Sequence, residues 1–449
     1  MPDDRLANLT AALLDAARVA GADTADAIAI DGTSVSIDVR QGQLEQAERA
    51  EGVEIGLRVM IGQRQACVSA SDISSATMAQ MAERAVAMAR EAPVDTTIGL
   101  ADPEQFARDP DIAALDMLDP THEPEPAALE DDARRAEAAA LAVTGVSQVQ
   151  SASAGYGRTQ VHLATSNGFS GGYGRSDRAI SCVAITGTGS GMERDYFGDS
   201  RLHQSDLMSP EDIGRLAGER TVARAGARQP KTGAYPVMFD ERIAASLIGH
   251  LVQAINGSAI ARGASWLRDA LGEQVLPRGM SLTEDPRRPR TSGSRPFDGE
   301  GLPTARRLIV DDGVLQGWTL DLATGRKLGM PSTASASRGT SSPPMPSVSN
   351  LSLTQGTLSR DALLAEMGTG LLVTSMIGST INPTTGDYSR GASGMWIENG
   401  VPVYPVNECN LAGNLRDMLL SLTAANDARS HLSRVVPSLR VEGLTLAGA

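Results

Sequence analysis

Apolar positions along the first hundred residues change from helical to strand-like spacing and back. In residues 5–20 apolar side chains recur every three or four positions and the pattern stops at Gly21, which predicts an amphipathic helix. Residues 25–71 instead alternate apolar and polar side chains in short runs separated by glycines, as antiparallel hairpins require. Residues 73–91 lack Gly and Pro and predict a second helix. The first subregion, about residues 1–100, therefore pairs a sheet with helices.

The same order repeats further along the chain. An acidic, proline-containing stretch at residues 102–125 predicts a connector. It is followed by a helix, a set of short strands with Gly turns, and another helix, at residues 126–142, 146–197 and 209–225. Ser209 with Pro210 next is a typical helix start. We expect a second subregion at about 125–228, and residues 1–228 together to form an N-terminal α+β region.

A change of composition at residues 229–233 predicts the start of a C-terminal domain over residues 229–449. Within it, residues 284–296 are rich in Pro and Arg, and residues 331–349 are rich in Ser and Pro. Both compositions predict exposed loops or mobile flaps that bury no core. The pair Asp311-Asp312 precedes a glycine, which predicts a hairpin turn rather than a pair of catalytic acids.

Size and charge narrow the class of protein. A chain of 449 residues exceeds what one hydrophobic core usually supports, so two or three packed units are expected. The formal charge of −14, without a long Lys/Arg block, argues against nucleic acid as a ligand. The acidic start does not resemble a signal peptide, and no run approaches the roughly 18 apolar residues of a membrane helix. We expect a cytoplasmic protein without a membrane partner.

Few residues offer chemistry on their own. Residues 237–252 predict a strand that enters a helix capped by Asp240, and His250 on that helix reads as a packed side chain. The five histidines are too far apart in sequence to pair on one helix face, and the three cysteines fit neither a disulfide framework nor a metal knuckle. Ser170 lies in a Gly-x-Ser-x-Gly pattern, but strand-like residues follow it where a nucleophile elbow needs a helix.

A long motif adds a family resemblance. Residues 378–400, which include Asn382-Pro383-Thr384-Thr385-Gly386-Asp387, look like the C-terminal signature of the PmbA/TldE branch of the TldD/PmbA family. Residues 249–255, 297–301 and 411–415 support the match, which extends over nearly the whole chain. The resemblance implies an α+β fold, with an N-terminal antiparallel sheet and helices followed by a β-rich C-terminal domain of TldD/PmbA type.

The resemblance also implies an activity and a partner. It indicates a cytoplasmic heterodimer of TldD and TldE subunits that degrades or trims unfolded peptides. In the TldD branch, two histidines of a His-Glu-x-x-x-His helix and a C-terminal cysteine hold zinc, with the Glu as general base. Here Ala245, Ser246 and His250 stand at those positions, and Cys409 lies earlier than the zinc-binding cysteine. We therefore expect no zinc and no catalytic residue in this chain, and zinc in a TldD-type partner.

The signature motif also supplies candidate contacts. Five of its residues are candidates for touching the peptide or the partner subunit, namely Asn382, Thr384, Asp387, Tyr388 and Arg390. The turn chemistry of Pro and Gly in the same segment favours a scaffold role for them instead, and the sequence leaves both interpretations open.

Two other functions stay as alternatives. One is a regulatory protein-binding module, in line with the family's association with modulation of DNA gyrase; the acidic charge suits a protein partner better than DNA. The other is an independent hydrolase with an unrecognised site, for which Ser170 is the motif-supported candidate. The sequence also leaves open whether the isolated chain forms a homodimer.

Overall fold

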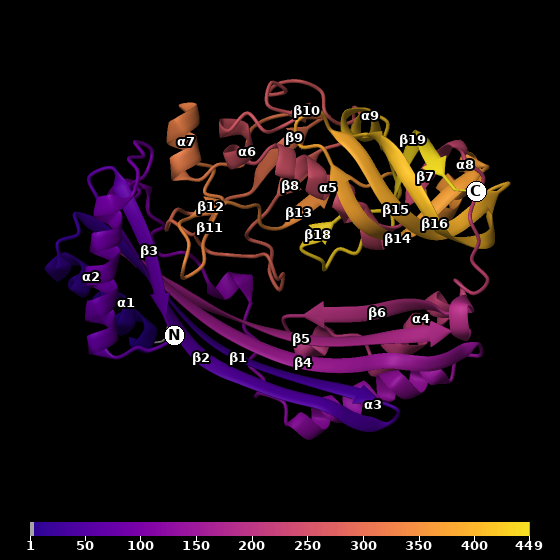
Figure 1. Cartoon of the computed structure of the whole chain (residues 1–449), viewed down its shortest axis with the longest axis horizontal. Coiled ribbons are helices and arrows are strands. Elements are labelled where there is room, and N and C mark those ends of the chain that lie inside the picture. Colours follow the sequence, from indigo (N-terminus) through magenta and orange to yellow (C-terminus); the bar gives the residue numbers. More distant parts are fainter. Residues whose placement is uncertain (1–3, 449) are drawn as a thin grey trace.

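The computed structural model describes residues 4–448, and its N-terminal half is built on one long antiparallel sheet (Figure 1). The order is β3-β2-β1-β4-β5-β6. Its strands are β1 (Thr24–Arg40), β2 (Gln43–Ile61), β3 (Arg64–Ala70), β4 (Val146–Thr165), β5 (Ser170–Thr186) and β6 (Glu193–Arg201). Because β1 pairs with β4 from Asp26 to Val39, strands from both predicted subregions form a single sheet. The antiparallel sheet predicted from the glycine-punctuated alternation is confirmed.

Four helices cover one face of this sheet. They are α1 (Asp4–Ala20), α2 (Ser75–Glu91), α3 (Pro126–Leu141) and α4 (Pro210–Val222), close to the ranges predicted from the apolar spacing. Alternate residues of β1 point to the helices: Ala27 is buried under α1 and α2, and Ile37 is buried under α3 and α4. Ile28, on the opposite face, packs instead against loops of the C-terminal half. The sheet therefore separates two apolar layers.

The C-terminal half contains a six-stranded sheet of order β16-β15-β14-β7-β19-β17, in which β16 also pairs with β19. This extra pairing closes five strands into a ring. The strands are β7 (Gly233–Phe239), β14 (Gly370–Ile381), β15 (Asp387–Glu398), β16 (Val401–Asn414), β17 (Thr423–Ala424) and β19 (Leu439–Ala447). Helices α5 (Glu241–Ala254), α8 (Arg360–Met367) and α9 (Leu415–Leu420) pack on it. A β-rich C-terminal half is thus confirmed.

Smaller elements connect the two halves. A five-stranded sheet contains β8 (Leu282–Glu284), β9 (Arg307–Asp311), β10 (Val314–Leu315), β13 (Leu351–Leu353) and β18 (Arg434–Val435). Nearby lie the hairpin of β11 (Ala336–Ser337) and β12 (Met345–Pro346) and the helices α6 (Gly257–Ala261) and α7 (Leu322–Leu328). Asp312 and Gly313 both have positive φ in the tight turn between β9 and β10, as predicted. No helix in the described part of the chain is both long and apolar enough to cross a bilayer.

The prediction that residues 284–296 and 331–349 are exposed was wrong for their inner residues. Ser294 and Ala336 are fully buried, and the Arg295 guanidinium donates to the carbonyl oxygens of Ala336 and Ser347, each at 2.8 Å. The reason is tertiary: both segments are sandwiched between the N-terminal sheet and the C-terminal domain. Arg338, for example, forms a buried ion pair with Asp26 of β1. Composition predicted loops correctly and could not predict what covers them.

Candidate functional site

The segment aligned with a zinc-binding helix forms the expected strand and helix at one end of the closed sheet. Strand β7 leads into α5, and the Asp240 carboxylate caps the helix by accepting a hydrogen bond from the backbone N–H of Arg242 at 3.3 Å. Arg242, Ser246 and His250 follow one another at intervals of four residues. They therefore lie along one side of α5, in successive turns.

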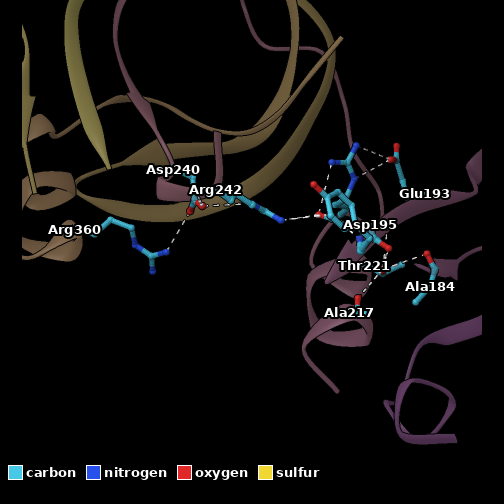
Figure 2. Close-up of polar contacts among 10 residues, drawn as sticks. Ala184, Glu193, Asp195, Ala217, Thr221, Asp240, Arg242 and Arg360 are labelled. Carbon is cyan, nitrogen blue, oxygen red and sulfur yellow. Dashed lines mark hydrogen bonds and ion pairs between the residues drawn. The ribbon is translucent and has the colours of Figure 1, made fainter. Parts of the chain in front are cut away.

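Arg242 links this helix to the N-terminal sheet, as Figure 2 shows. Its Nη1 lies 3.2 Å from Oδ2 of Asp195 on β6, and its Nε lies 3.4 Å from Oδ1 of Asp240. The Asp195 backbone N–H donates in turn to the hydroxyl of Thr221 on α4 at 3.2 Å. Because Asp195 and Arg242 are both largely buried, solvent screens their attraction less than at a surface. The helix is thus fixed against β6.

A cleft of about 960 Å³ opens beside this junction. One wall is β6 with Glu193 and Tyr196, and the other is formed by α5 and β14. Ser246 and Arg390 both line it, so one of the motif positions and one of the candidate contact residues share a cavity. The cleft lies between the halves of the chain, where ligand sites are common.

Strand β14 brings an unpaired edge to this cleft. It pairs with β7 only from Leu371 to Val373, whereas its pairing with β15 continues to Ile381. Residues 375–377 therefore have strand partners on one side only within the described chain, and Thr374 lies at a bulge just before them. All four residues line the cleft. An edge of this kind exposes backbone donors and acceptors that an extended peptide can pair with.

His250 lies outside the large cleft, in a smaller cavity of about 320 Å³ that Trp266 and Pro383 also line. Neither of its ring nitrogens has a hydrogen-bond partner among the described residues. Its ring packs edge-on against Tyr388, with the centroids 5.8 Å apart. Burial, together with the nearby Arg390 cation, lowers the pKa of His250, so the ring is neutral at pH 7.

The five candidate contact residues divide into three environments. Arg390 reaches the cleft while its Nε donates to the Gly378 carbonyl oxygen at 2.7 Å. Tyr388 is buried, and its hydroxyl lies 3.7 Å from the Met376 sulfur. The remaining three are exposed: Asn382 and Thr384 belong to the hairpin turn between β14 and β15, and Asp387 is the first residue of β15.

Inside that turn the polar side chains bind the turn itself. The Asn382 side-chain oxygen accepts from the Thr384 backbone N–H at 2.9 Å, and the Thr385 hydroxyl donates to Asp387 at 2.6 Å. The turn predicted from Pro and Gly is confirmed. Asp387 and Arg390 do not bond to each other here: Asp387 accepts from Thr385, and Arg390 donates to Gly378. Of the five, Arg390 is the residue whose position suits contact with a ligand in the large cleft.

Domain models of one family match three stretches of the chain. They are described as PmbA/TldA metallopeptidase domain 1, central domain and C-terminal domain, and match residues 25–89, 119–225 and 232–448. Metalloprotease PmbA of Escherichia coli O157:H7 is 35% identical over 92% of this chain and 90% of the relative. This chain belongs to the TldD/PmbA metallopeptidase family. The Haemophilus influenzae PmbA homologue is 34% identical over 93% of this chain and 90% of its own length.

Solved structures agree with the family fold. A protein from Bacteroides thetaiotaomicron, described as a candidate modulator of DNA gyrase, superposes with a TM-score of 0.91 at 28% identity and full coverage of both chains. TldE from Thermococcus kodakarensis superposes with a TM-score of 0.85 over 98% of this chain and all of its own. At 18% identity the second likeness bears on the fold alone.

The donor set of this TldD/PmbA chain does not fit a zinc site of the kind that the TldD branch of the family implies. A catalytic zinc needs about three protein ligands, and no three His, Cys, Asp or Glu side chains among residues 4–448 are grouped to hold a metal ion. Ala245 has no donor atom and packs against the hydrophobic core. Cys409 is buried on β16 with its Sγ 3.3 Å from the Ala392 carbonyl oxygen, and burial raises the pKa of its thiol to about 11.

A serine and a histidine meet elsewhere in the N-terminal sheet. Ser170 begins β5 after the turn that follows β4, and its Oγ lies 3.3 Å from Nε2 of His162 on β4. The other ring nitrogen, Nδ1, lies 2.9 Å from the Thr10 hydroxyl of α1. Burial lowers the pKa of His162. Sequence reasoning missed this pair because eight residues of a hairpin separate its members. A threonine occupies the place where a catalytic triad has a carboxylate.

Proposed function

We propose that this chain is the non-zinc partner subunit of a cytoplasmic TldD-type zinc peptidase and helps to hold unfolded peptide substrate. The observation that carries the proposal is the helix α5, where Ala245 and Ser246 stand at the positions of a zinc ligand and its general base. Ser246 lines a large cleft, and the contact of its hydroxyl there is with the Met376 sulfur at 4.0 Å rather than with a carboxylate. The relatives named metalloprotease PmbA agree with a peptidase context.

The cleft suits an extended polypeptide. Residues 374–377 of β14 offer an unpaired strand edge, and main-chain pairing there binds a peptide with little regard to its sequence. Arg390 adds a cation on the same wall. In this scheme the partner subunit supplies the zinc and the chemistry, while this chain closes and shapes the peptide chamber.

Purified subunits test the proposal. The chain is prepared alone and together with its TldD-type partner, and both preparations are assayed for zinc content and for cleavage of an unstructured peptide. We expect zinc and cleavage in the mixture and neither in the isolated chain. Zinc or cleavage in the isolated chain would contradict the proposal. Size-exclusion chromatography of each preparation distinguishes the heterodimer from a homodimer of the isolated chain.

The Ser170–His162 contact favours one second candidate, an independent hydrolase. The Ser170→Ala variant distinguishes this hydrolase from the partner-subunit proposal. If Ser170 is the nucleophile, the substitution abolishes cleavage by the isolated chain. Under the leading proposal, it leaves cleavage by the two-subunit mixture unchanged. If neither preparation cleaves, the family's regulatory alternative, binding to a protein partner, becomes the better reading.

A further inference from the structure

A second cleft, of about 420 Å³, adjoins the large one, and Tyr196 and Arg242 line both. Although the whole chain carries a net charge of −14, this cleft concentrates positive side chains. Its lining includes five arginines, which are Arg201, Arg220, Arg242, Arg290 and Arg429. Only Asp177 and Asp199 among its lining residues are acidic. Among the side chains that line this cleft, positive groups therefore outnumber negative ones, opposite to the balance of the molecule as a whole.

Four of these arginines already have carboxylate partners. The pairs are Arg201 with Asp199 at 2.9 Å, Arg242 with Asp195 at 3.2 Å, Arg290 with Asp116 at 2.6 Å, and Arg429 with Glu241 at 2.8 Å. Arg220, in the last turn of α4, forms no ion pair with any described residue. A half-buried guanidinium without a carboxylate in direct contact is unusual, because an ion pair normally offsets the desolvation of such a charge.

The position of Arg220 leaves its donors free. The guanidinium carbon lies 4.5 Å from the centroid of the buried Phe197 ring on β6. The guanidinium N–H groups of Arg220 form no hydrogen bond to a described residue, so they are available for a planar, bidentate acceptor. Burial, and then the neighbouring Arg242 cation, lower the pKa of Arg220, while the more distant carboxylates of Asp240, Asp195 and Glu241 act in the opposite direction.

We propose that Arg220 binds the terminal carboxylate of a peptide whose backbone continues along the free edge of β14. A carboxylate matches the fork of a guanidinium, and the chain end is the one place where a peptide backbone itself carries this group. The shared lining residues Tyr196 and Arg242 make the path from Arg220 to the β14 edge continuous. This inference rests on the proposed function and assigns a polarity to the bound peptide.

Binding to the isolated chain tests the assignment without any need for cleavage. Two unstructured peptides of one sequence, labelled with fluorescein at the N-terminus, carry either a free C-terminal carboxylate or an amide, and binding is followed by fluorescence anisotropy. We expect the free acid to bind at least about tenfold more tightly, since charge-assisted bidentate hydrogen bonds are among the strong ones. Arg220→Gln is expected to remove this difference and to leave binding of the amide unchanged.

A matched control lies on the same helix. Arg215 is exposed and pairs with Asp212 and Glu219 within α4, so Arg215→Gln makes the same change in charge away from the cleft. The control is expected to retain the tenfold preference for the acid. Arg220→Lys keeps the charge but loses the bidentate guanidinium, so it is expected to retain less than half of the tenfold preference for the acid. Thermal melting of each variant establishes that it is folded.

Several outcomes would overturn the assignment. One is that the natural chain binds the free-acid and amide peptides equally. Another is that the Arg215 and Arg220 variants lose the preference for the free acid to the same extent. An amidated peptide ending in Glu that binds as well as the free acid would show that a side-chain carboxylate occupies the cleft instead. In the two-subunit mixture, the Arg220 variant should raise KM for free-acid peptides at constant kcat. Absence of cleavage there, with the preference intact, would count against the proposed function alone.

Discussion

His250 is half-buried, and its two buried ring nitrogens bind nothing among the described residues. Burial of a ring nitrogen without a hydrogen-bond partner destabilises the folded state, and coordination of a metal ion would offset this cost. Among the described residues, no donor set for a metal surrounds this ring. Its edge-on packing against Tyr388 is an ordinary aromatic contact. At the scale of single residues, the histidine thus behaves as a packed ring in a site that lacks the rest of its donors.

Replacing this ring by a purely apolar one should therefore stabilise the protein. We expect His250→Phe to raise the free energy of unfolding by about 1 kcal/mol at pH 7, measured by urea denaturation. The gain should grow below about pH 6.5, because the lowered pKa of His250 means that the unfolded state binds a proton there and the folded state does not. Cleavage by the two-subunit mixture should be unchanged.

The exposed His122 offers the control, since His122→Phe alters a histidine that packs against little. Equal gains in both variants would argue against the role of the unpaired nitrogens. A marked loss of stability in His250→Phe would mean that the buried ring nitrogens bind something that the ring of Phe cannot replace.

Individual elements show where close approach of two backbones holds the halves together. Gly56 of β2 lies directly against the loop that contains Thr340, and a Cβ atom at Gly56 would stand 2.2 Å from the Thr340 carbonyl oxygen. Thr340 also donates from its hydroxyl to Glu54 of the same strand at 2.6 Å. The loop therefore sits on the strand at a position where only a glycine fits.

Two glycines of β2 should respond with opposite signs to the same substitution. Gly56→Ala is expected to lower the free energy of unfolding by about 2 kcal/mol, because the added methyl must displace the Thr340 backbone. Gly52→Ala, in the same strand with nothing within 4 Å of the new carbon, should raise stability by about 0.5 kcal/mol. Thermal or urea unfolding of both variants provides the comparison, and equal effects would refute the close contact.

The sequence was sufficient to predict those structural elements that depend on residues close to one another in the chain. The Asp240 cap, the Pro383-containing turn and the Asp312-Gly313 turn, with both residues of the last at positive φ, all form as predicted. The link between Arg242 and Asp195 escaped prediction because 47 residues separate the pair and nothing local to either residue announces it. The same holds for the buried loops, whose covering sheet is remote in sequence.

Across the whole molecule, buried charges occupy the boundary between the halves. Asp26 of β1 pairs with Arg58 of β2 and with Arg338 of the C-terminal loops, and Arg58 Nε donates to Asp26 at 2.7 Å. Nearby, the buried Glu300 carboxyl accepts from the Leu322 backbone N–H at 2.9 Å. Burial and the neighbouring Asp298 raise the pKa of Glu300 to about 8. Ionising it means placing another negative charge in the interior.

Stability should consequently depend on pH through Glu300. Its pKa is raised in the folded state from about 4.3 in the unfolded chain, so its stabilising contribution is present below about pH 4.3 and is lost as pH rises towards and past 8. Glu300→Gln cannot ionise, and its melting temperature relative to the natural chain should rise between pH 5 and pH 9. A difference that is the same at every pH would contradict a protonated Glu300.

The unpaired edge of β14 in the large cleft has a consequence for which polypeptides this protein can distinguish. A folded protein has already committed most of its main-chain N–H and C=O groups to its own helices and sheets. A damaged or incompletely synthesised chain has not. Under the proposed function, residues 374–377 would therefore select a polypeptide by its conformational state rather than by its sequence. Folded proteins of the cell would then escape binding without the need for any recognition motif.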